Sequence, residues 1–174
     1  MEYISEELVE ETWQEFASFS PARAQKEMIR ISKSQPNLLA FIMEFTKELD
    51  QEVRELAIYM FYVICRMFQK GSKRRIKRVS PEEIIKCYDK NEQFIKRLGG
   101  AHNKFFERVA GLQFSAQPYV MKYMVETPME APEEEDPVAF TEDDTGYLFL
   151  LLKTVIDLLD KKLRFERMKK SENS

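Results

Sequence analysis

The ten consecutive apolar or aromatic residues Leu56–Cys65 constrain the fold of this chain more than any other feature of its sequence. A helix that is hydrophobic on every side must be covered on every side. The run is far shorter than the ~20 residues of a membrane-spanning helix, although a buried strand would also give a short apolar run. Asp50 can cap a helix, and charged residues beside the run extend the helix-forming stretch to about five turns. We therefore predict a central helix over residues 50–69.

The composition is typical of a soluble protein built from helices. The 174 residues are enough for one domain with a substantial core, and 44% hydrophobic with 33% charged residues is ordinary for such a chain. Only five glycines favour helices over sheets joined by tight turns. The first residues lack the basic and apolar regions of a secretion signal, and Cys65 and Cys87 lie in apolar helical contexts where free thiols are common. We expect an all-α cytoplasmic protein.

Helical spacing, capping residues and prolines predict about eight helices in a single domain, residues 1–174. Ser-Pro and Gln-Pro pairs place proline at the first helical position, where its missing N–H group costs no hydrogen bond. The third and fourth helices follow each other with almost no loop, so we expect an antiparallel pair. The expected helices cover about residues 5–19, 21–34, 36–49, 50–69, 81–98, 105–112, 118–125 and 147–163.

A stretch of ten residues occurs twice in similar form. The ten residues from Gln35 align with the ten from Gln117, with three identities and five more positions that keep an apolar or aromatic type. Such self-similarity can define an architecture, although any helix begun by a proline gives a related pattern. The prediction is two similar antiparallel helical halves, about 5–69 and 80–167, joined by a basic linker at 70–79.

Residues 36–69 resemble one helix pair of a HEAT-like repeat. The turn Leu49–Ala57 is similar to the Asp-x-x-Val-Arg-x-x-Ala signature between the two helices of that family. The resemblance covers about a fifth of the chain, and the second half departs from it with Asp144-Thr-Gly-Tyr where Val-Arg is expected. It implies a stacked helical array that displays a binding surface and performs no chemistry.

Residues suited to catalysis are scarce. His102 is the one histidine, without the second histidine or cysteine cluster that a zinc or di-iron site requires. Gly99-Gly100 lacks a preceding strand and a following Gly-Lys-Ser/Thr, so it is better interpreted as a helix stop than as a phosphate loop. We predict no catalytic residue, no metal and no cofactor.

Segment 70–78 contains six basic residues in nine. Such a segment can neutralise phosphates and release counterions, but no aromatic residue is interleaved for base stacking and the net charge is −3. A solvated loop between helices is the simplest interpretation, and whether it pairs with the acidic segment 126–144 is left open. The residues that we expect to contact a partner here are Lys73, Arg74, Arg75, Lys77 and Arg78.

Residues 126–144 contain nine carboxylates, three prolines and no basic residue, a composition typical of an exposed loop. The segment lacks the spacing and turn glycine of an EF-hand, so a basic partner is favoured over a cation. The candidate contact residues are Glu133, Glu134, Glu135 and Asp136.

Together these features predict a non-catalytic cytoplasmic interaction or adaptor module that binds a protein partner through a helical surface and its charged loops. Polyanion or nucleic-acid binding through segment 70–78 is the first alternative. An enzyme whose site uses scattered carboxylates is the second. The oligomeric state is left open.

Overall fold

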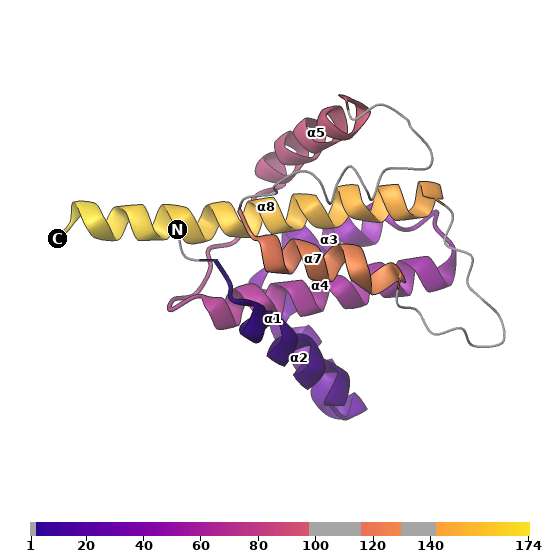
Figure 1. Ribbon diagram of the computed structural model, residues 1–174, viewed down its shortest axis with the longest axis horizontal. Helices are drawn as coiled ribbons and strands as arrows, with labels where there is room; N and C mark the ends of the chain where they lie inside the picture. The colour runs from indigo at the N-terminus through magenta and orange to yellow at the C-terminus, as the bar shows by residue number, and fades with distance from the viewer. Residues whose placement is uncertain (1–2, 98–115, 130–141) are drawn as a thin grey trace.

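The computed structural model describes residues 3–97, 116–129 and 142–174, and these ranges are helical with no strand (Figure 1). The prediction of an all-α fold is confirmed. None of the described helices is both long and apolar enough to cross a membrane. The expected helix at 105–112 lies outside the described residues. The helices are α1 (Glu6–Ser18), α2 (Pro21–Ser34), α3 (Pro36–Phe45), α4 (Gln51–Gly71), α5 (Pro81–Arg97), α7 (Pro118–Glu126), the short 3-10 helix η1 (Thr127–Met129) and α8 (Glu142–Glu172).

The predicted helix starts are formed by local side-chain caps. Ser5 Oγ accepts a hydrogen bond from Leu8 N at 3.2 Å and caps α1. Ser80 and Glu83 form the expected capping box, in which each side chain accepts from the other's backbone N–H group. Asp50 occupies the N-cap position of α4 but makes no side-chain capping bond.

Helices α4 and α8 lie side by side and run in the same direction through the middle of the molecule (Figure 1). Every residue from Met60 to Cys65 in α4 is buried, as the apolar run predicts. The matching apolar stretch of α8 begins at Leu148 and forms the other half of the core. The other helices therefore act as covers for these two.

The covering helices are arranged with a two-fold pattern. Helix α1 packs on α4 and α7, and α5 packs on α8 and α3. Helix α3 packs on α4 as α7 packs on α8. Exchanging α1 with α5, α3 with α7 and α4 with α8 leaves this set of contacts unchanged. The pattern agrees with two similar halves, and their origin by duplication stays a prediction.

The two Gln-Pro pairs also have matching roles. Gln35 and Gln117 are each 2% exposed and start α3 and α7 with similar backbone angles. Gln35 Nε2 donates to Lys77 O at 2.9 Å, and its Oε1 accepts from Val79 N at 3.1 Å. Gln117 Oε1 accepts from Ile4 N at 2.9 Å. Each glutamine thus holds the segment that leads into the first helix of the other half.

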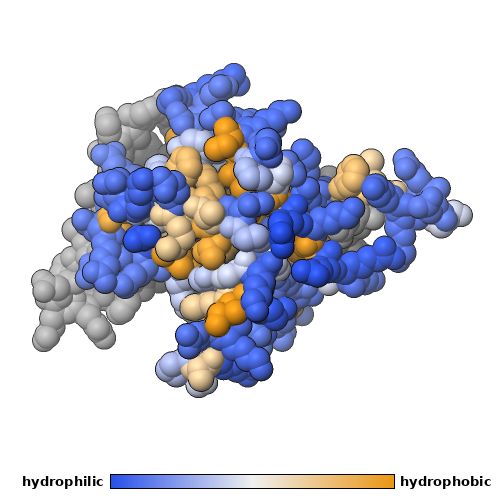
Figure 2. Space-filling model, turned by 180° about the vertical axis from the view of Figure 1, so that it is seen from behind, coloured by the Kyte–Doolittle hydropathy of each residue, from blue (hydrophilic) through white to orange (hydrophobic). Residues whose placement is uncertain are grey.

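Helices α3 and α8 have bounds that differ from the sequence-based expectation. Helix α3 ends at Phe45 and not near residue 49, and Thr46 Oγ1 there donates back to Ile42 O. Helix α8 does not end near residue 163 but continues to Glu172, and it begins at Glu142, inside the expected acidic loop 126–144, and not near residue 147. Its last turns project beyond the other helices (Figure 1) and display hydrophobic residues among hydrophilic ones (Figure 2). The spacing of apolar residues predicted neither of these C-terminal ends, because polar residues are found both within helices and in the loops that follow them.

Candidate anion-binding cleft

A cleft of about 470 Å³ lies where α2 and α4 end beside the segment 72–79, which leads into α5. This volume is typical of sites that bind small ligands or short stretches of a larger one. The described residues that line it include five cations and no carboxylate. The cations of this basic cleft are Arg30 and Lys33 from α2, and Lys73, Arg74 and Arg75 from the segment 72–79.

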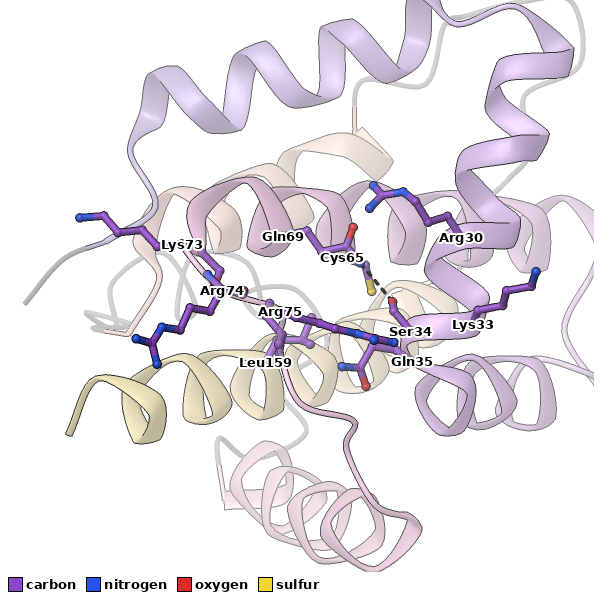
Figure 3. A pocket seen from close by; sticks show the side chains of 12 residues that line it. Arg30, Lys33, Ser34, Gln35, Cys65, Gln69, Lys73, Arg74, Arg75 and Leu159 are labelled. Atoms are coloured by element: carbon purple, nitrogen blue, oxygen red, sulfur yellow. Dashed lines mark hydrogen bonds between the residues drawn. The ribbon is translucent and has the colours of Figure 1, made fainter. Parts of the chain in front are cut away.

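The cations stand on two rims and do not converge on one point (Figure 3). Arg30 and Lys33 project from α2 on one side of the cleft, and Lys73 and Arg74 point away from the opposite side. Arg75 extends across between them, toward Ser34 and Gln35. An elongated anion can meet several of these charges at once, whereas a single small anion would meet few.

The segment 72–79 is held firmly although it is not helical. Ser72 Oγ accepts from Arg74 N at 3.2 Å and donates to its carbonyl oxygen at 2.6 Å. Ile76 and Val79 are buried, and the amide of Gln35 holds the backbone on both sides of residue 78. Because the backbone is already ordered, an incoming ligand would lose little free energy to loop ordering.

Most of the charge in the basic cleft is uncompensated. Arg30 pairs with Glu27 at 2.8 Å, and Arg66 pairs with the same carboxylate. The other four cations of the cleft make no ion pair with any carboxylate in the described parts of the chain; they are Lys33, Lys73, Arg74 and Arg75. The site therefore has a strong positive potential that an anionic ligand can neutralise.

The floor of the cleft is partly polar and partly apolar. Gln69 Nε2 donates to Ser34 Oγ at 3.1 Å, which fixes the orientation of both side chains (Figure 3). Leu159 of α8 and Ile76 form its apolar part but are only 1% and 7% exposed. Burial raises the pKa of the Cys65 thiol above its usual range, so this group stays protonated at neutral pH and is a poor nucleophile.

The structure brings together part of the predicted basic site. Lys73, Arg74 and Arg75 line the cleft, whereas Lys77 and Arg78 do not. Arg78 Nη2 instead donates to the carbonyl oxygen of Lys33 at 3.3 Å. Arg30 and Lys33 were missed by the sequence analysis, and the signal that could have found them is two cations three residues apart on the exposed side of α2.

Pairing between the basic and acidic segments stays open, because most of the acidic segment lies outside the described residues. Lys70 pairs with Glu11 and Glu15 of α1, so this basic residue has an internal structural role. The predicted acidic contact residues lie outside the described residues, namely Glu133, Glu134, Glu135 and Asp136. His102 also lies outside them.

Other site types find little support in the described residues. Within residues 3–97, 116–129 and 142–174, no three histidine, cysteine, aspartate or glutamate side chains are placed to hold a metal ion. The basic cleft is the site with the clearest ligand preference, for an extended anion. No protein-family model, curated protein or solved structure matches this chain, so its function has to be inferred from the geometry of this cleft.

Proposed function

We propose that this chain is a non-catalytic interaction module that binds an acidic segment of a partner protein in the basic cleft. The proposal depends on one observation, the five cations on two rims with no carboxylate among the described lining residues. Guanidinium and ammonium groups form charge-assisted hydrogen bonds with carboxylates, and arginine can do so in a bidentate manner.

The lining of the basic cleft favours a peptide over single-stranded nucleic acid. The described lining residues include no aromatic ring on which a base could stack. The protonated Cys65 thiol adds no reactive group to the floor.

The test compares two variants with the same change in net charge. The first replaces Lys33, Arg74 and Arg75 with glutamine. The second replaces Lys86, Lys90 and Arg97 of α5, exposed cations that do not line the basic cleft. Fluorescence anisotropy measures binding of a labelled peptide in which glutamates alternate with aliphatic residues. We expect the cleft variant to bind roughly tenfold more weakly, because each exposed charge pair contributes at most about 1 kcal/mol.

The α5 variant should bind the peptide as the unmodified chain does. Equal weakening in both variants would mean that only net charge matters, and the basic cleft would not be the site. An oligonucleotide of similar length serves as the competing ligand, with salt dependence measured in parallel. Tighter binding of the oligonucleotide at physiological salt, lost in the cleft variant alone, would replace the acidic peptide with nucleic acid.

A further inference from the structure

A second hollow, of about 590 Å³, lies where α3 ends and where α4 and α8 begin. Its floor is apolar, formed by Phe45, Leu49 and Tyr147. Tyr147 Oη donates to the carbonyl oxygen of Phe45 at 2.7 Å and fixes this floor. Carboxylates surround the floor, so we call this site the acidic hollow. Glu44 already pairs with Lys47 of the same chain, so the carboxylates that the argument uses are Glu48 and Asp143.

The opposite end of α8 has the complementary chemistry. Phe165 and Met168 are 54% and 64% exposed and lie three residues apart, so they share one side of the helix. Lys169 Nζ lies 5.1 Å from the centre of the Phe165 ring. Lys170 is also exposed in these last turns, as is Glu172. The projecting end of α8 is therefore an apolar surface among cations.

One chain cannot bring these two surfaces together. Tyr147 and Phe165 lie on the same continuous helix, and 18 residues at 1.5 Å each place them about 27 Å apart. The C-terminal end of α8 projects beyond the other helices, and its first turns lie at the other end of the molecule (Figure 1). Residues of those first turns line the acidic hollow. Any contact between them must involve two molecules.

We infer that the projecting end of α8 docks into the acidic hollow of a second copy of this chain, head to tail. Phe165 and Met168 cover the apolar floor, and the lysines beside them face the carboxylates on the rim. Because the two surfaces differ, the contact is heterologous, and a pair of copies keeps one free hollow on one copy and one free α8 end on the other. Association of this kind continues to higher oligomers as concentration rises. The inference is independent of the proposed role of the basic cleft.

The first test is sedimentation velocity over a range of protein concentrations. The unmodified chain should form oligomers that grow with concentration, and raised salt should weaken them. The double variant F165S/M168S should associate at least roughly tenfold more weakly, since both side chains are exposed and can change without loss of the core. Circular dichroism confirms that the variant is folded. A monomeric unmodified chain, or undiminished association of the variant, would overturn the inference.

Charge exchange gives a sharper test. One variant reverses the hollow with E48K/D143K, and the other reverses the α8 end with K169E/K170E. Each alone should be monomeric, because like charges then face each other. An equal mixture should associate again, because the acidic α8 end of one matches the basic hollow of the other. A mixture that stays monomeric, while both variants are folded, would show that these surfaces do not meet.

Discussion

At the scale of single residues, Glu15 is the charged group that most directly joins α1 to α4. Its carboxylate accepts hydrogen bonds from Lys70 Nζ at 2.9 Å and from Arg66 Nη2 at 2.7 Å. Lys70 first, and Arg66 in addition, hold the pKa of the Glu15 carboxyl below its usual value against an opposing effect of burial. A lowered pKa in the folded state means that the stabilisation is present above the ordinary glutamate pKa and is lost as pH falls through the folded value.

The substitution Glu15→Gln should therefore lower stability at pH 7 by roughly 1–2 kcal/mol, because hydrogen bonds to charged groups contribute about 1.5–3 kcal/mol when buried and less at a partly exposed carboxylate such as this one. At about pH 3, where the unfolded carboxyl is already protonated, the difference from the unmodified chain should shrink. Urea unfolding at both pH values measures this. Glu10→Gln, at an exposed glutamate of the same helix, should show neither effect. An E15Q penalty that stays the same at both pH values would contradict the electrostatic explanation.

At the scale of helices, α4 is the element on which the core depends. Met60 and Ile64 are fully buried, and they lie four residues apart on one side of the helix. Replacing either with alanine removes packed volume from a site that can close only partly. We expect each replacement to lower the free energy of unfolding by roughly 2–5 kcal/mol, measured by urea denaturation. Met43→Ala, at an exposed position of α3, should cost much less. Losses below about 0.5 kcal/mol at both Met60 and Ile64 would place the core elsewhere.

At the scale of the whole molecule, the two glutamines of the Gln-Pro pairs connect the halves in both directions. Replacing Gln35 with alanine leaves Lys77 O and Val79 N without their partner. Replacing Gln117 does the same to Ile4 N and to Asp160 Oδ1, which accepts from Gln117 Nε2 at 2.9 Å, although Asp160 Oδ2 keeps its ion pair with Arg164. A buried polar group left unpaired costs about 1–3 kcal/mol, so we expect similar losses of stability from the two variants.

Thermal and urea unfolding measure these losses, with the exposed Gln51→Ala as control. Q35A should in addition weaken ligand binding at the basic cleft, because it releases the segment 72–79, whereas Q117A should not. Penalties no larger than that of Q51A would mean that water replaces both amides and that the halves are held by apolar contacts alone.

Much of the fold could be predicted from the sequence because helix formation is local. Ser5 and Ser80 cap helices that begin within three residues of them, and the capping box at Ser80 needs only Glu83. The burial of Met60–Cys65 in α4 follows from the uninterrupted apolar character of the run, whereas Leu56, Ile58 and Tyr59 before them are only partly buried. The end of α8 could not be predicted, since its last turns are charged and make few contacts with the body. Propensity alone does not decide whether such turns stay helical.

The candidate site could be predicted only in part, because some of its residues are far apart in the sequence and close together only in the folded chain. Three cations that line the basic cleft could be predicted from the sequence because they are adjacent in the chain: Lys73, Arg74 and Arg75. Arg30 and Lys33 join them across some 40 positions of sequence only because the buried amide of Gln35 holds the segment 72–79 beside the end of α2. The sequence by itself determined the helices, their caps and the apolar core of α4. The tertiary structure decided which charges share a cleft and what each buried glutamine binds, because hydrogen bonds and charge interactions depend on distance through space and not along the chain.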